Sequence, residues 1–321
     1  MNFVGIDIGG TNVRVALVDE GGRIRAKAST PTFADRGAGV SIGLIIEVVR
    51  ALISGAAVSR LDGLGIGITG PVDASTGVVS NPYTLAGWPP TDVRTPFAEA
   101  FGVPVVVDND ANVAAVGEWW VGAGRGSRRL AVITIGTGIG AATLLEGRIQ
   151  RAEDGRHGEA GHMILNPTGP PCYCGANGCW EVLASGTALG RAARERAWSE
   201  GGVLWRLAAG HLERVDSELL FQAALGGDAP AQALIDETSV WLGLGFVNLA
   251  AAFMPDLFVV AGGVSEHLEL LRPGIERVLK RHSVMVPCDV PILRALLGED
   301  AGPIGAARLA LDLARMDGLP N

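Results

Sequence analysis

The sequence predicts an α/β protein whose two halves repeat one pattern. A strand, a glycine-rich turn and a second strand occupy residues 3–18, and the same order recurs at residues 131–149. Further apolar segments of strand length alternate with longer helical segments, as in α/β folds. Hydrophobic residues make up 48% of the 321 residues and charged residues 19%, which is typical of a packed globular chain. The recurrence indicates a duplicated fold.

Charge and hydropathy narrow the class of protein. The net charge is −8, the isoelectric point is about 5.2, and no run of Lys or Arg occurs, which argues against nucleic acid as the main partner. The N-terminal residues MNFVGIDIGG do not have the pattern of a signal peptide. The most apolar run, at 131–145, is too short for a membrane span. We therefore expect a cytoplasmic protein with no membrane partner.

The first repeat is predicted to be a β-meander, with a strand at 3–8 and a tight turn at 9–12. It lacks the spacing of a dinucleotide-binding fingerprint, and the chain has no G-x-x-x-x-G-K-[ST] phosphate loop. The turn nevertheless suits a phosphate, because backbone N–H groups can approach oxygens where side chains are small. Asp7 before it could hold the magnesium of a nucleotide. An ordinary hairpin turn is the alternative.

Four polar residues lie where a strand at 103–107 is predicted to meet a helix: Asp108, Asn109, Asp110 and Asn112. Upstream of them we expect a helix at 41–54, a strand at 64–69, a loop at 80–96 and a short helix at 95–101. Asn109 or Asp110 as a helix N-cap is the structural explanation, but a cap needs one such residue. Strand ends of this kind bind ligands in open α/β sheets. The cluster therefore favours a functional role for Asp110.

The second repeat has its turn at Gly136–Gly140, after a flexible connection expected at 122–126. Helical segments follow at 185–200 and 228–252, and a last helix is expected at 303–316. A strand that begins at residue 256 ends in Gly262–Gly263, where a flat ring or a phosphate could approach the backbone. A close strand–helix turn explains the glycine pair equally well.

One imidazole and three thiols are close together in the sequence: His162, Cys172, Cys174 and Cys179. Such a set is typical of a closed, structural zinc site, and Gly and Pro between the ligands suit a loop around one ion. Buried free thiols or a disulfide are the alternatives, and a chain without a signal peptide makes a disulfide less favoured. Cys288 lies apart and is expected to be a buried thiol; His157 is expected to be a loop residue rather than a ligand.

Six segments in order resemble the ROK family of sugar kinases: DIGGTN (7–12), NDAN (109–112), GTGIG (136–140), GEAGH (158–162), CxCGxxGCxE (172–181) and AGG (261–263). They cover nearly the whole chain, and the cysteine segment is the most specific. The resemblance implies a two-lobed actin-like, hexokinase-like ATPase fold with ribonuclease H-like duplicated βββαβα units. The expected lobes are residues 1–120 with 303–321, and residues 121–302 with the zinc loop at 159–181.

The resemblance also implies roles for individual residues. Asp110 is the expected catalytic base and, with Asn109, contacts the sugar, and a base of this kind contributes roughly 10²–10⁴-fold. Glu159, His162 and Glu181 are expected to bind sugar hydroxyls, with His162 holding zinc through its other nitrogen. The expected nucleotide contacts are Asp7, Gly9, Gly10, Thr11, Asn12, Gly136, Thr137, Gly138, Gly262 and Gly263.

The function implied is transfer of the ATP γ-phosphoryl group to the 6-hydroxyl of a hexose, with glucose as the leading substrate and with magnesium and a structural zinc ion. Kinases for N-acetylmannosamine, N-acetylglucosamine or fructose are alternatives. The choice depends on the shape of the pocket around the sugar C2, which residues 70–88 are expected to line. A non-catalytic sugar sensor is the alternative outside enzymes. The family's repressors carry a helix-turn-helix before the first strand, for which we expect no room here. A homodimer is expected from the family alone.

Overall fold

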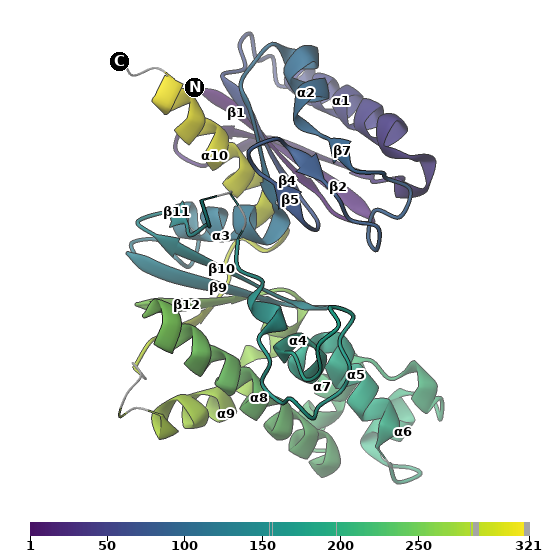
Figure 1. Cartoon of the computed structure of the whole chain (residues 1–321). Helices are drawn as coiled ribbons and strands as arrows, with labels where there is room; N and C mark the ends of the chain where they lie inside the picture. The colour runs from purple at the N-terminus through teal and green to yellow at the C-terminus, as the bar shows by residue number, and fades with distance from the viewer. Residues whose placement is uncertain (154, 156, 197, 283, 285–288, 318–321) are drawn as a thin grey trace. The chain divides into compact units, whose positions relative to one another are not determined.

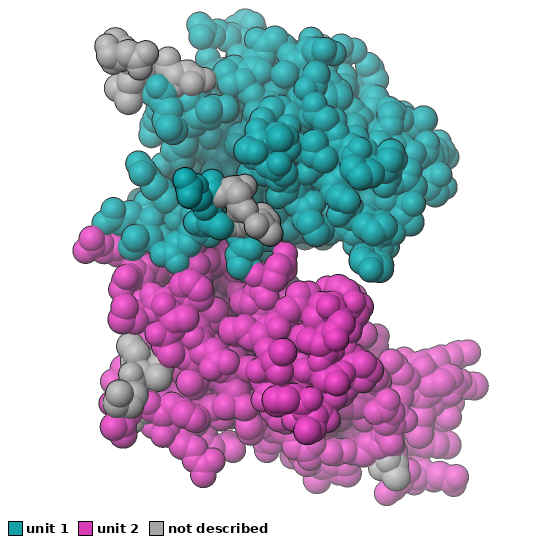
Figure 2. Space-filling view, in the orientation of Figure 1, with its two compact units in different colours: residues 1–127, 144–158, 296–321 teal, residues 128–143, 159–295 magenta. Residues whose placement is uncertain are grey.

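The computed structural model describes residues 1–153, 155, 157–196, 198–282, 284 and 289–317 (Figure 1). The chain forms two compact units (Figure 2). Unit 1 consists of residues 1–127, 144–158 and 296–321, and unit 2 consists of residues 128–143 and 159–295. The sequence-based division into lobes stays a prediction.

The sheet of unit 1 has five strands in the order β3-β2-β1-β4-β8. The first three strands form the predicted antiparallel meander, and β4 and β8 extend it in parallel pairing. Their bounds are β1 Asn2–Ile8, β2 Asn12–Asp19, β3 Ile24–Pro31, β4 Gly63–Ile68 and β8 Val105–Asn109. Short strands β5 (Val72–Asp73), β6 (Val78–Val79) and β7 (Thr91–Asp92) form a separate small sheet, and β7 lies within the loop predicted at 80–96.

Helices cover both faces of this sheet (Figure 1). Helices α1 (Ala38–Gly55) and α2 (Arg94–Phe101) pack on the face where Val4, Ile6 and Ile8 point. Helices α3 (Asp110–Val121) and α10 (Ala301–Asp317) pack on the other face. The predicted helices at 41–54 and 303–316 are confirmed, and they begin three and two residues earlier than expected.

Glycines make the second face flat enough for α3 and α10 to approach closely. In β4, Leu64, Ile66 and Ile68 point to one face, as expected for side chains of period two. Gly63, Gly65 and Gly67 occupy the alternate positions, and a Cβ on Gly65 would clash with the Ala306 carbonyl of α10. A Cβ on Gly305 of α10 would likewise clash with the Val113 carbonyl of α3. The two helices therefore meet backbone to backbone.

A buried carboxylate fixes the segment that was expected to be a flexible connection. Glu118 of α3 is 1% exposed. Its carboxylate accepts hydrogen bonds from Ala123 N at 2.8 Å, Leu296 N at 3.2 Å and Leu297 N at 2.8 Å. Residues 122–127 form hydrogen-bonded turns after α3. Glu118 thus anchors both stretches near which the chain leaves and re-enters unit 1.

The second sheet repeats the order of the first as β11-β10-β9-β12-β13. Strand β12 (Leu257–Ala261) pairs in parallel with β9 (Arg129–Ile135) and with β13 (Ile292–Arg294), as β4 does with its two neighbours. Strand β10 (Ile139–Leu145) continues from unit 2 into unit 1 and there pairs with β11 (Arg148–Ile149). The shared order confirms the predicted duplication.

Six α-helices of unit 2 surround an aromatic core that includes Trp180, Phe221, Phe246 and Phe258. The longest, α8, was expected at 228–252 and spans Ala229–Phe253, and Asp228 caps its N-terminus. The others are α4 (Trp180–Ala184), α5 (Gly186–Glu195), α6 (Val203–Leu207), α7 (Ser217–Leu225) and α9 (Leu268–Arg281).

Helix α1 is the one helix of the described residues that is long and apolar enough to cross a membrane. Four of its side chains are buried in unit 1, namely Ser41, Ile42, Ile45 and Val49. The core helix of a globular protein meets the same criteria, so one such helix is a weak indication of a membrane span.

The close contact of α3 and α10 predicts that Gly305→Ala will lower the free energy of unfolding by about 2 kcal/mol or more, because the new methyl group has no space. Gly43→Ala is the matched control. A Cβ there meets no atom within 4 Å, so the change should stabilise α1 by about 0.5–1 kcal/mol. Urea unfolding monitored by circular dichroism measures both. Equal stabilities for the two variants would contradict the backbone contact.

Candidate active site and metal centre

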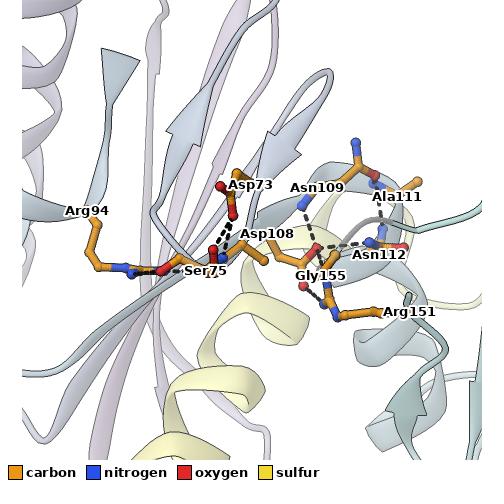
Figure 3. Close-up of polar contacts among 10 residues, drawn as sticks. Asp73, Ser75, Arg94, Asp108, Asn109, Ala111, Asn112, Arg151 and Gly155 are labelled. Carbon is orange, nitrogen blue, oxygen red and sulfur yellow. Dashed lines mark hydrogen bonds and ion pairs between the residues drawn. The ribbon is translucent and has the colours of Figure 1, made fainter. Parts of the chain in front are cut away.

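The predicted catalytic segment lies where β8 ends and α3 begins. Asn109 is the N-cap of α3, and its side-chain oxygen accepts hydrogen bonds from Ala111 N and Asn112 N (Figure 3). Its side-chain amide donates to Gly70 O at 3.2 Å. Asp110 is the first residue of the helix, where the helix dipole favours a carboxylate. Asn109 already supplies the N-cap, so capping does not account for a carboxylate at the next position, Asp110.

Asp7 lies at the end of β1, on the sheet face covered by α10. A Cβ on Gly302 of α10 would clash with its side chain, so the helix backbone covers the carboxyl group. Burial, and then the negative charge of Asp110, raise the pKa of Asp7 to about 7. Arg14 on the paired strand opposes this shift, with its Nη1 atom 3.8 Å from Asp7 Oδ2. The structure therefore brings Asp7 and Asp110, two of the predicted residues, into electrostatic contact.

The first glycine turn joins β1 to β2. Gly9 N donates to Asn12 O at 3.0 Å, and Thr32 Oγ1 donates to Gly9 O at 2.6 Å. Thr11 and Asn12 are exposed at the tip. The turn has the small residues that the predicted phosphate contact needs, a Cβ on Gly10 would clash with the side chain of Thr84, and Asp7 lies two residues before Gly9.

In unit 2, the second glycine turn joins β9 to β10 and is held by the predicted sugar-binding segments. Glu181 Oε2 accepts a hydrogen bond from Ile139 N at 2.9 Å. Gly161 packs so closely on Ile139 that a Cβ would clash with its carbonyl oxygen. The predicted sugar ligand Glu181 thus has a contact that the sequence did not indicate, since it accepts a hydrogen bond from the end of the second glycine turn.

A cavity of about 520 Å³ opens beside this turn, within unit 2. Three of the predicted nucleotide contacts line it, namely Gly136, Thr137 and Gly263. Gly262 has a left-handed φ of 84°, which glycine adopts without strain, and it precedes the turn into Gly263. The cavity therefore brings the two predicted nucleotide segments of unit 2 together.

Sequence reasoning missed most of the polar lining of this cavity. His267 stacks on Phe221, with ring centroids 4.3 Å apart at 16°, and its Nε2 atom lies 2.9 Å from Glu218 Oε2. This contact with His267 lowers the pKa of Glu218. These residues lie outside the motifs, and no local pattern marks them. The lining also includes Thr187, Arg194, Asp216 and Ser217.

The four predicted metal ligands converge. Their ligand atoms all lie within 4.8 Å of one another, with Cys172 Sγ 3.5 Å from His162 Nδ1 and Cys174 Sγ 3.6 Å from Cys179 Sγ. A disulfide needs about 2.05 Å between sulfur atoms, so the thiols are free. The edges of a tetrahedron around zinc are about 3.5–3.8 Å for these ligands. The cluster could hold a metal ion, and its donor set and these two ligand distances fit zinc.

His162 is oriented by this cluster. Its Nδ1 atom faces Cys172, and its Nε2 atom lies 3.2 Å from the hydroxyl of Tyr173, whose side chain is 68% exposed. The nitrogen expected to meet a sugar hydroxyl thus meets a phenol hydroxyl here. Glu159 is exposed just before the short 3₁₀ turn Ala160–His162.

Two remaining expectations concern single residues. His157 lies outside helices and strands, as predicted, and the metal-ligand group does not include it. Cys288 lies outside the described residues.

The raised pKa of Asp7 predicts a pH-dependent cost to folding. The folded state holds this proton up to about pH 7, and the unfolded chain releases it near pH 3.8, so ionising Asp7 destabilises the fold as pH rises through this window. In magnesium-free buffer, we expect Asp7→Asn to gain on the order of 1–3 kcal/mol of unfolding free energy over the native sequence between pH 5 and pH 8.

Asp73→Asn is the control, since hydrogen bonds from Ser75 and Thr76 lower the pKa of Asp73 to about 2. Its stability difference from the native sequence should be the same at pH 5 and pH 8. Urea unfolding at both pH values tests this pair, and a pH-independent difference for Asp7→Asn contradicts the burial of its charge.

Comparison with known proteins gives the family. The ROK family profile matches residues 3–313. The chain is 34% identical over 311 residues to the glucokinase of Halalkalibacterium halodurans, covering 96% of this chain and 94% of that protein. The structure of a ROK hexokinase from Thermus thermophilus superposes with a TM-score of 0.81 at 34% identity, covering 99% of this chain and all of that one.

A second solved structure is a ROK family glucokinase from Streptomyces griseus in complex with glucose and AMPPNP. It gives a TM-score of 0.78 at 35% identity and covers 97% of this chain and all of that one. These neighbours confirm the predicted actin-like sugar kinase fold. The match over nearly the whole sequence shows that this chain belongs to the ROK family.

Proposed function

We propose that this chain is an ATP-dependent glucokinase, which transfers the γ-phosphoryl group of ATP to the 6-hydroxyl of glucose. The observation that carries the proposal is Asp110, a carboxylate at the first position of α3 beside a helix cap already supplied by Asn109. The glucokinases at about 34% identity support the choice of reaction and of glucose. We include in the proposal a cytoplasmic location and a homodimer, which rest on the family resemblance.

In the proposed mechanism, Asp110 accepts the proton of the sugar hydroxyl as its oxygen attacks the γ-phosphorus. The bond between that phosphorus and the bridging oxygen of ADP breaks, and the products are the sugar phosphate and ADP. Asn109 orients the sugar, and its amide is held by Gly70 O. The start of α3 fixes where the Asp110 carboxylate lies, and this placement suits it to accept the proton.

The nucleotide is proposed to use the glycine turns and the cavity of unit 2. Gly9 N closes the turn of unit 1 by bonding Asn12 O, so Gly10, Thr11 and Asn12 offer the backbone and short side-chain donors to phosphate oxygens. In unit 2 Gly136 N bonds Gly138 O within the turn, so Thr137 and Gly138 offer the donors. On the nucleoside side, Gly263 lines the cavity and Gly262 precedes it in the chain. A bound magnesium ion would neutralise phosphate charge, and the buried Asp7 carboxylate is the group that would hold it.

The metal cluster is proposed to hold a structural zinc ion through His162 Nδ1 and the three thiolates. A zinc ion held there would fix the loop that carries the proposed sugar ligands Glu159, His162 and Glu181. The Nε2 atom of His162 would meet a sugar hydroxyl once the exposed Tyr173 side chain moves away. Because Glu181 also binds Ile139 N, the sugar loop and the phosphate turn are tied within unit 2.

The proposal is tested by ATP-dependent phosphorylation of glucose, mannose, fructose, N-acetylglucosamine and N-acetylmannosamine with magnesium present. We expect the highest kcat/KM for glucose. The variant Asp110→Asn should keep glucose binding by calorimetry and lose about 10²-fold or more of kcat. A higher kcat/KM for another sugar would assign the chain to a different class of ROK kinase. Glucose binding without turnover by the native chain supports the sensor alternative.

The zinc assignment predicts about one zinc ion per chain and its loss in Cys174→Ser. Glucose affinity should fall in the same variant, because the loop that carries Glu159 and Glu181 loses its support. Zinc content by inductively coupled plasma mass spectrometry and glucose binding by calorimetry measure the two effects. Cys288→Ser is the control, since Cys288 lies far in the sequence from the four predicted ligands. Unchanged zinc content in Cys174→Ser rules out the assignment.

A further inference from the structure

A buried carboxylate precedes the catalytic segment and is not one of the predicted site residues. Asp108 is 2% exposed at the end of β8. Its Oδ1 atom accepts hydrogen bonds from Asn109 N at 2.6 Å and from Asn112 Nδ2 at 2.9 Å. Asp108 therefore binds both ends of the first turn of α3, the turn that contains Asp110.

One guanidinium group neutralises this buried charge. Arg151 binds both carboxylate oxygens of Asp108, with Nη2 on Oδ2 and Nη1 3.3 Å from Oδ1 (Figure 3). Its Nη1 atom also lies 3.4 Å from Gly155 O. Among the described residues, Arg151 is the cation that forms an ion pair with Asp108. Two oxygens and two nitrogens fix both the distance and the orientation of the carboxylate.

Arg151 comes from a distant part of the sequence. It follows β11 by two residues, and 42 positions separate it from Asn109. The segment it belongs to leads directly into the GEAGH motif at 158–162. Arg151 thus connects the chain that enters the sugar-binding motif with the carboxylate that holds the catalytic turn, and both partners belong to unit 1.

We propose that Arg151 and Asp108 are positioning residues for the phosphoryl transfer, because their bidentate ion pair sets the orientation of the α3 first turn and so of Asp110. This inference rests on the proposed kinase function. Neither residue is proposed to contact the substrate. Their effect passes through the Asp108 bonds to Asn109 N and Asn112 Nδ2.

The bidentate geometry of the Arg151–Asp108 pair leads to a specific prediction for lysine at position 151. Lysine keeps the positive charge, but its ammonium group is a point charge that cannot bind both oxygens in one plane. If charge alone mattered, Arg151→Lys would be equivalent to the native chain. If orientation matters, Arg151→Lys lowers kcat about 10-fold, and Arg151→Gln lowers it about 10²-fold, the loss typical of a small misplacement of a reacting group.

The experiment measures steady-state kinetics with glucose and ATP for the native chain, Arg151→Lys, Arg151→Gln, Asp108→Asn and the double variant Asp108→Asn/Arg151→Gln. We expect kcat to fall by a larger factor than glucose affinity measured by calorimetry, since Asn109 keeps its own bond to Gly70 O. The losses in the double variant should be less than the product of the single losses, because both changes break one interaction.

Arg196→Gln is the matched control. Arg196 also binds two oxygens of one carboxylate, that of Glu237, and its side chain is 33% exposed against 24% for Arg151. The Arg196 pair lies on the surface of unit 2, so its loss should leave kcat within about twofold of the native value. Thermal unfolding of every variant separates a loss of fold from a loss of position.

Two outcomes overturn the proposal. The first is a folded Arg151→Lys or Arg151→Gln variant with native kcat. The second is a loss of kcat that is fully multiplicative across the double variant. If Arg151→Gln does not fold, the kcat of Arg151→Lys decides. Failure of the proposed function is distinct, since the native chain itself would then show no turnover on glucose.

Discussion

The close contact of α10 with the sheet of unit 1 and with α3 is the constraint on which the candidate active site depends. Glycine occupies the contact positions on both sides, so carbonyl groups of one element lie where side chains would otherwise be. This contact covers Asp7 with the backbone of α10 and sets where α3 begins beside it. Backbone packing therefore places the carboxylates: Asp7 is partly covered, and Asp110 acts on its charge, because the elements that meet here have glycine at their contact positions.

This region of unit 1 holds the carboxylates of Asp7 and Asp108, and an arginine pairs with each of them. Asp7 and Asp108 pair in register with the same residue, Gly67 of β4, from its two sides. Arg14 reaches Asp7 from the neighbouring strand, and Arg151 reaches Asp108 from beyond β11. The raised pKa of Asp7 shows that its compensation is partial, since burial and Asp110 outweigh Arg14. A partly compensated carboxylate is suited to a cation that arrives with a ligand, whereas a bidentate pair is suited to permanent positioning.

Patterns within short stretches of the sequence predicted the features whose residues lie close together in the chain. The duplicated hairpins, a cap at Asn109 or Asp110 and the proposed metal cluster are each encoded within a short stretch, and the structure shows the duplicated order of strands, the cap at Asn109 and the convergence of the four predicted ligands. Contacts between distant segments were not predictable in this way, because nothing near Arg151 marks Asp108 as its partner. The contact of Tyr173 with His162 depends on how the loop closes. The alternation of glycine in GLGIGI was a usable signal, since period two places all three glycines on one face.

The duplication also places two similar turns in different surroundings. In both units a glycine turn follows the first strand of the sheet, so the backbone can approach a phosphate in either place. The surroundings then differ. In unit 1 the turn lies directly after the buried Asp7. In unit 2 it is bonded by Glu181 and borders the 520 Å³ cavity. The two turns therefore share an order of strands but have different surroundings: Asp7 belongs to the first repeat itself, whereas Glu181 comes from outside the second.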